Sequence, residues 1–130
     1  MGIVLSNDFD GLLSRIRKEA EDGIKSELAR RSFVDRSVFG MFMPLIIDVI
    51  TEAGKASLIV SKDGSIEMRR QLSPNPDIVL RADFDMLSEL YHSRSRQEFR
   101  AAERQGRIEI RSNTAKGQLS EARFRELLGG

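Results

Sequence analysis

Three short segments that are rich in β-branched residues or alternate apolar with polar ones, separated by turn residues, constrain the fold more than any other feature of the chain. They are Leu45–Thr51, Lys55–Ser61 and Ser65–Arg70. Glu52-Ala53-Gly54 separates the first pair, and Lys62-Asp63-Gly64, with the Asp-Gly pair that tight hairpin turns prefer, separates the second. Because such short connections join antiparallel neighbours, the sequence predicts a meander of three antiparallel strands.

Two further strands are expected after the meander. Asp77–Asp83 follows the break at Pro74-Asn75-Pro76, and Arg107–Ser112 alternates apolar with charged residues. Successive side chains of a strand point to opposite faces of its sheet, so one face is expected to be apolar. The residues predicted on that face are Ile47, Val49, Leu58, Val60, Ile66, Met68, Ile78, Leu80, Ile108 and Ile110.

Residues 8–31 have the pattern of one amphipathic helix. Apolar residues recur there at spacings of three and four, and the opposite face carries basic and acidic residues in balance. A helix that lies on a membrane is normally biased towards Lys and Arg, so docking onto the protein's own body or onto a partner helix is favoured. The apolar stripe comprises Phe9, Leu12, Leu13, Ile16, Ala20, Ile24 and Leu28.

Three shorter helices complete the expected elements. One covers residues 84–91; the next begins at the capping box formed by Ser95 and Glu98 and ends at Gly106; the last covers residues 120–128. Strands followed by helices and a returning strand predict an α+β fold. We expect a five-stranded, mainly antiparallel sheet with helices packed on one face, preceded by the N-terminal amphipathic helix.

The composition limits the classes of function. The 130 residues are 40% apolar and 32% charged, enough for one domain with its own core, and the net charge of +1 gives no strong field to attract nucleic acid. The chain has no cysteine, which excludes disulfides and thiolate sites. Its start lacks the basic flank of a signal peptide, and no run approaches the roughly 18 apolar residues of a spanning helix. A cytoplasmic protein is expected.

Motifs for catalysis or cofactor binding are missing from the sequence. His92 is the only histidine and has no partner at metal-ligand spacing, so it is expected at the surface near a helix end. The ten glycines form neither dinucleotide-binding nor phosphate-binding motif. The arginines of residues 94–111 are interleaved with glutamates, which favours a solvated face over nucleic-acid contact. We predict no cofactor, no metal and no catalytic residue, leaving open an accessory role in an enzyme system.

The order of these features from about Met41 onwards resembles the sterol carrier protein type 2 domain family. The resemblance is carried by LIIDVITEAGKASLIVSKDGSIEMRR, PDIVLRADFDMLSELY, EFRAAERQGRIEIRSN and LSEARFRELL. The chain departs from the family at Tyr91-His92-Ser93, where many members have Thr-Gly, and at Ser112-Asn113, where many have Gly-Asn or Gly-Asp. Its N-terminal helix is also longer and more charged. We therefore divide the chain into a helical extension, 1–34, and a sterol-carrier-like domain, 35–130.

The resemblance implies an apolar tunnel between sheet and helices, in which family members bind sterols, fatty acids, acyl-CoAs or phospholipids without chemistry. The expected partner is a lipid or another apolar small molecule, with transient membrane contact and no nucleic acid. The alternative is a structural or interaction module with a filled pocket, which forms a homo-oligomer or docks a partner through its N-terminal helix. Residues expected to line the tunnel, each also a candidate for plain core, are Phe39, Met41, Phe42, Met43, Leu58, Val60, Met68, Leu80, Leu87, Leu90, Phe99, Ile108, Phe124 and Leu128.

Overall fold

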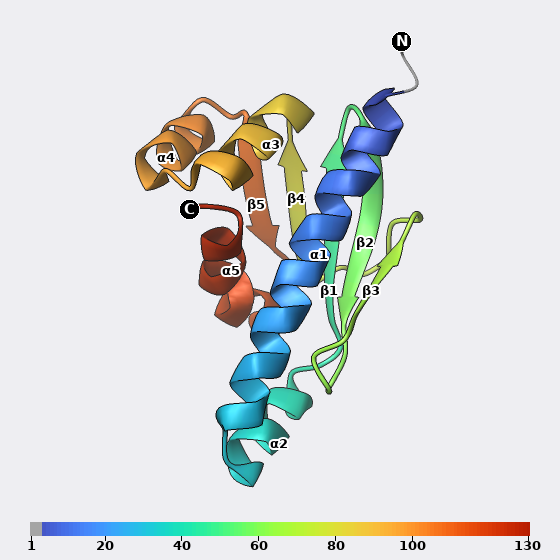
Figure 1. The fold of residues 1–130 in the computed structure, drawn as a ribbon, viewed down its shortest axis with the longest axis vertical. Coiled ribbons are helices and arrows are strands. Elements are labelled where there is room, and N and C mark those ends of the chain that lie inside the picture. The colour runs from blue at the N-terminus through green and yellow to red at the C-terminus, as the bar shows by residue number, and fades with distance from the viewer. Residues whose placement is uncertain (1–3) are drawn as a thin grey trace.

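A five-stranded sheet forms the centre of the protein in the computed structural model, which describes residues 4–130 (Figure 1). The strands lie in the order β3-β2-β1-β4-β5, so the chain starts the sheet in its middle and completes one edge after the other. The strand bounds are β1 Leu45–Thr51, β2 Gly54–Val60, β3 Ile66–Arg69, β4 Ile78–Ala82 and β5 Ile108–Ser112.

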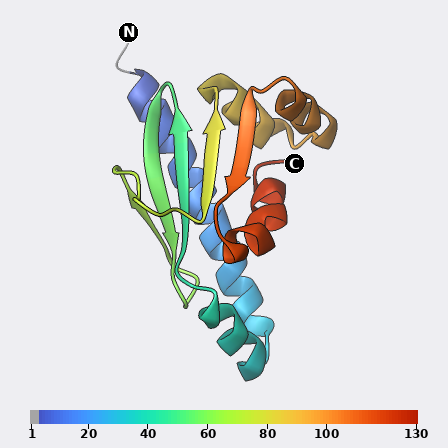
Figure 2. The same ribbon diagram turned by 180° about the vertical axis from the view of Figure 1, so that it is seen from behind.

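The strand pairing confirms the predicted meander and the mainly antiparallel sheet. β1 pairs with β2, β2 with β3, and β4 with β5 in antiparallel register, whereas β1 and β4 are parallel. The β3–β4 connection crosses the sheet face that lies away from the helices (Figure 2). There the backbone N–H of Ser73 donates to the buried carboxylate of Asp48, at 3.1 Å to the nearer oxygen, and the hydroxyls of Ser73 and Ser57 lie 2.8 Å apart.

The helices α1, α3, α4 and α5 lie on the other face of the sheet, and α2 lies beyond the end of the sheet, as the two opposite views show (Figures 1 and 2). The predicted α+β fold with helices on one face is therefore confirmed. The long helix α1 crosses the sheet diagonally, with α5 beside it and with α3 and α4 near the β4–β5 edge. The helix bounds are α1 Val4–Arg30, α2 Phe33–Met41, α3 Phe84–Ser93, α4 Arg96–Arg104 and α5 Ala115–Leu127.

Local capping explains where several helices begin and end. The Ser95 hydroxyl accepts the N–H of Glu98 at 3.3 Å, and Gly106 follows α4 with φ +73°, as predicted. The last helix starts at Ala115 and not at Ser120, because the Thr114 hydroxyl accepts the N–H of Gly117 at 3.0 Å and caps an earlier turn. The sequence did not predict α2, whose apolar residues form no inward stripe.

The N-terminal half of α1 belongs to the core of the protein. Phe9, Leu12, Leu13 and Ile16 are each at most 5% exposed. The ring of Phe9 packs so closely on Gly54 that a Cβ there would lie 2.7 Å from a ring carbon. This part of the apolar stripe is therefore used within the chain, and the proposed division at residue 34 stays a prediction.

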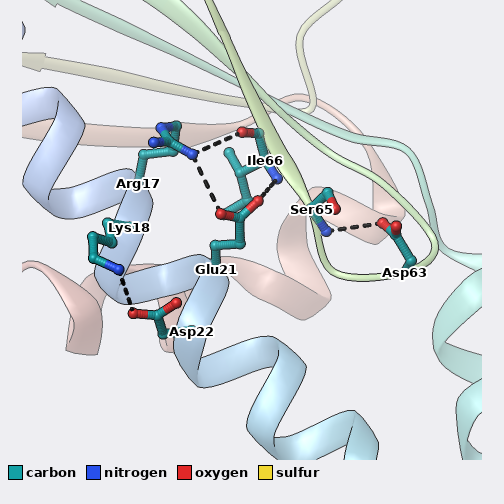
Figure 3. A network of polar contacts seen from close by, with 7 residues as sticks. All are labelled: Arg17, Lys18, Glu21, Asp22, Asp63, Ser65 and Ile66. Carbon is teal, nitrogen blue, oxygen red and sulfur yellow. Dashed lines mark hydrogen bonds and ion pairs between the residues drawn. The ribbon is translucent and has the colours of Figure 1, made fainter.

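Polar side chains of α1 hold the helix to the edge strand β3 (Figure 3). Glu21 accepts the backbone N–H of Ile66 at 2.9 Å, and Arg17 donates to the carbonyl of Ile66 at 3.4 Å and to Glu21 at 3.3 Å. Backbone groups on an edge strand otherwise offer a site for pairing with another chain. The Arg17–Glu21 pair satisfies both groups of Ile66 and also fixes α1 across the sheet.

The buried carboxylate of Asp77 joins three elements just before β4. It is 3% exposed and accepts hydrogen bonds from the backbone N–H of Ile46 in β1 at 2.8 Å and from the hydroxyl of Thr114 at 2.7 Å. Thr114 in turn caps α5, and Lys116 of that helix places its ammonium 3.7 Å from Asp77. The carboxylate thus fixes the start of α5 relative to β1 and β4.

Replacing Gly117 by alanine is expected to destabilise the fold, because a Cβ at this position would lie 2.3 Å from the carbonyl oxygen of Asp77. We expect a loss of about 1–3 kcal/mol in the free energy of unfolding, measured by urea denaturation. Gly11→Ala is the matched control: nothing lies within 4 Å of the added Cβ, so the variant should gain about 0.5–1 kcal/mol. Equal effects of the two substitutions would contradict the close approach of Gly117 to the carbonyl oxygen of Asp77.

Candidate functional site

A pocket of about 680 Å³ lies between α1, the sheet and α5. Its volume is within the range of ligand sites, roughly 300–1,000 Å³. Most of its walls are apolar and come from different parts of the chain: α1 contributes one side, the β1–β2–β3 half of the sheet the floor, and α5 the opposite side. The apolar lining comprises Ile16, Ala20, Gly23, Ile24, Phe39, Met43, Leu45, Ile47, Leu58, Val60, Ile66, Phe124 and Leu127.

The side-chain sizes along α1 explain why the space is unfilled here. Leu13 and Ile16 fill the space between helix and sheet in the first half, but the second half presents Ala20 and Gly23 to the pocket. A Cβ built on Gly23 would meet nothing within 4 Å. The second half is nevertheless held in place, because Ile24 and the neighbouring turn of α1 contact Gly64 in the β2–β3 turn.

Charged side chains surround the pocket where α1 faces α5 and the end of α3. Glu27 of α1 pairs with Arg123 of α5 at 2.8 Å, and Glu19 of α1 pairs with Arg94 at 2.6 Å. The Arg94 guanidinium also donates to the carbonyl of Leu127 at 2.6 Å. The guanidinium groups of Arg31 and Arg123 hold the pKa of Glu27 below its ordinary value. An apolar interior with a charged rim can accommodate a molecule that has one apolar and one polar part.

Tyr91 of α3 belongs to the same polar cluster, although it does not line the pocket. Its hydroxyl donates to the carboxylate of Glu19, and the Arg94 guanidinium lies 4.7 Å from the centre of its ring. Burial and, secondly, the hydrogen bond to Glu19 raise the pKa of Tyr91 to about 12. The neighbouring His92 is exposed in the last turn of α3, as the sequence predicted, and its Nδ1 lies 2.7 Å from the carbonyl of Ser88.

We expect a spectroscopic titration to find a pKa of about 12 for Tyr91, compared with 10 for a free tyrosine. The chain has one tyrosine and no tryptophan, so the tyrosinate absorbance reports this residue alone. The pKa of Tyr91 is higher in the folded state than in the unfolded state. The stability that protonated Tyr91 contributes is therefore complete below pH 10 and is lost as the pH rises towards 12. Glu19→Gln should lower the pKa; a wild-type value of 10 would refute the cluster.

The structure places some of the residues predicted to line the pocket around it, and others elsewhere. Phe39, Met43, Leu58, Val60 and Phe124 lie at the pocket. Met41 and Phe42 are exposed on and beside α2, and Met68 packs partly buried against the core. The remaining predicted residues are buried in the core, where α3, α4 and the end of α5 pack on the sheet: Leu80, Leu87, Leu90, Phe99, Ile108 and Leu128. Ligand contact stays a prediction for all of them.

The contribution of α1 to the pocket was not predicted from the sequence. Ile16, Ala20 and Ile24 belong to the predicted apolar stripe, which the proposed division places in an extension outside the ligand-binding domain. The sequence signal for them is a change of side-chain size along the stripe, from large residues to Ala20 and to Gly23, its neighbour on the same helix face. Small residues on the inward side of a long helix indicate either close packing or unfilled space.

Within residues 4–130, no group of three or more His, Cys, Asp or Glu side chains is arranged to hold a metal ion. No helix in the same range combines the length and the apolar character needed to cross a membrane.

No family model and no curated protein matches the sequence. The similarity lies in the structure: a sterol carrier protein domain 2 from Helicoverpa armigera superposes with a TM-score of 0.54 at 13% identity, over 89% of this chain and 87% of that one. The chain has the sterol carrier protein 2 fold. Sterol carrier protein 2 from Yarrowia lipolytica, in its apo form, gives 0.50 at 15% identity, over 92% and 91% of the two chains. This confirms the resemblance predicted from the sequence at the level of the fold.

The same fold also matches part of a much larger enzyme. The inverting sec-alkylsulfatase Pisa1 from Pseudomonas sp. superposes with a TM-score of 0.51 at 16% identity, over 72% of this chain but only 14% of that one. The similarity therefore concerns a small part of the sulfatase. The sterol carrier protein 2 fold occurs both as a protein by itself and as a component of a longer chain.

Proposed function

We propose that this protein binds a lipid or a similar apolar molecule in the pocket between α1, the sheet and α5, and carries it without covalent chemistry. The observation that supports this most directly is the pocket itself: about 680 Å³ with mostly apolar walls and a charged rim. Sterol carrier proteins share the fold, which supports the same class of function. Fatty acids, acyl-CoAs, sterol-like molecules and phospholipids are the candidate ligands.

The physical chemistry of the pocket favours an amphiphile. An apolar cavity holds water poorly, and each Å² of apolar surface that a guest buries there contributes roughly 25 cal/mol. The Glu27–Arg123 and Glu19–Arg94 pairs at the rim are exposed enough to exchange partners with water or with a polar head group. The acyl or ring part of the ligand would lie over Leu58.

The alternative role, an interaction module that pairs through the N-terminal helix, has less support. The stripe from Phe9 to Ile16 that would have served such a partner packs on the protein's own sheet. Self-association stays a prediction, and light scattering of the full chain tests it. Transfer of a lipid would require only transient contact with a membrane.

Partly filling the pocket should weaken ligand binding without harming the fold. Gly23→Leu adds a side chain at a position that lines the pocket, and nothing within 4 Å obstructs its Cβ. We expect binding of a fluorescent fatty acid to weaken by about tenfold or more, corresponding to about 1.4 kcal/mol. The free energy of unfolding should not fall, because leucine is a better helix former than glycine.

Gly11→Leu is the matched control in the same helix. Its added Cβ also meets open space, but Gly11 lies away from the pocket lining, so ligand affinity should stay at the wild-type value. Solvent extraction of the gently purified protein, followed by mass spectrometry, should identify a bound lipid. The proposal fails if the wild-type protein yields no lipid and shows no saturable binding, or if both leucine variants lose affinity equally.

A further inference from the structure

The short helix α2 exposes apolar side chains to solvent and has no buried residue. Phe33, Val34 and Met41 are 76%, 68% and 81% exposed. Elsewhere in residues 8–130, only Leu119, at 70%, is a large apolar side chain of comparable exposure. We call the exposed set the α2 apolar face; it comprises Phe33, Val34, Val38, Met41 and Phe42.

These residues gather on one side of the helix, because positions 33, 34, 38 and 41 fall within one arc at 3.6 residues per turn. Phe39 faces the other way and lines the pocket, together with Met43 just beyond the helix. A nine-residue helix is marginal in water by itself, and most helices gain their stability by burying the apolar face. The helix α2 would therefore gain stability if its exposed apolar side were buried in an apolar environment outside the protein.

Basic side chains border the α2 apolar face. Arg36 and Lys62 line a shallow depression together with Phe33 and Met41. Arg30 and Arg31, at the end of α1, immediately precede the helix. Asp35 and Asp63 lie next to Arg36 and Lys62 in the sequence, and Glu27 pairs with Arg31 at 3.1 Å, so the four basic residues outnumber the three acidic ones by one. Exposed apolar residues with Lys and Arg around them are typical of helices that bind anionic lipid surfaces.

The size of the patch argues against a second protein chain as its partner. A stable protein interface uses roughly 20–30 residues on each side, whereas α2 has nine residues in total and only one side of them is apolar. Partial insertion into a bilayer needs no complementary surface. The α2 helix also lies at the end of the molecule opposite α3 and α4, where a flat membrane could approach it (Figures 1 and 2).

We infer that the α2 apolar face docks the protein onto anionic phospholipid membranes. Phe33, Val34 and Met41 would enter the boundary between head groups and acyl chains, and Arg36 and Lys62 would contact lipid phosphates. Docking in this orientation would place α2, whose Phe39 lines the pocket, between the pocket and the membrane. The inference goes beyond the proposed function, because a protein can bind a lipid in its pocket without docking by this face.

Co-sedimentation of the full-length protein with vesicles tests the inference. We expect binding to vesicles of mixed phosphatidylcholine and phosphatidylglycerol, weaker binding to phosphatidylcholine alone, and a decrease with added salt. The double variant Phe33→Ser/Met41→Ser should lose about tenfold or more in vesicle affinity. Arg36→Glu/Lys62→Glu should reduce binding to the mixed vesicles and leave the weak binding to phosphatidylcholine unchanged.

Leu119→Ser is the matched control, since Leu119 is 70% exposed but lies on α5, and it should bind vesicles like the wild type. Titration with a soluble fluorescent fatty acid, without vesicles, measures the pocket separately. It should give wild-type affinity for Phe33→Ser/Met41→Ser, because neither side chain is in the pocket lining. Absence of binding to mixed vesicles, or an equal loss in Leu119→Ser, would overturn the inference. So would a wild-type dimer in light scattering that Phe33→Ser/Met41→Ser converts to a monomer.

Discussion

The hydrogen bonds of the Asp77 carboxylate determine how the two parts of the sheet and the last helix fit together. A parallel pair of strands needs a long connection between them, and β1 and β4 are joined through two other strands and a loop. Asp77 fixes this pairing at its first residues by accepting the N–H of Ile46, while Thr114 brings the start of α5 to the same carboxylate. Because α5 is one wall of the pocket, the position of that wall depends on a buried acid outside it.

The pocket occupies only one half of the helix-covered face of the sheet. Over β4 and β5, α3 and α4 present large side chains such as Leu87 and Phe99, and both of these are fully buried. Over β1 and β2, the covering element is the second half of α1, where Ala20 and Gly23 replace larger residues. The same sheet therefore serves as packed core on one side and as the floor of a pocket on the other.

Alternation and turn chemistry made the strands predictable, because these signals are local. The pairing of β1 with β4 could not be predicted in the same way, since it rests on a contact between Ile46 and Asp77, which are far apart in the sequence. The helix α2 was not predicted because most of its apolar residues face solvent. The pocket lies where α1 residues with small side chains pass over Leu58. Periodicity shows which side of α1 faces the sheet, but it does not show which strand residues each turn of the helix lies over.

The two halves of α1 differ in what they rest on. The half around Leu13 is part of the interior, whereas the half around Gly23 spans unfilled space and is held by the polar contacts of Glu21, by the turn at Gly64 and by the Glu27–Arg123 pair. Local stability in proteins follows the density of buried contacts, so hydrogen exchange should be slower in the first half of this continuous helix than in the second. A ligand in the pocket would supply the missing contacts and make the local stability of the helix similar in both halves.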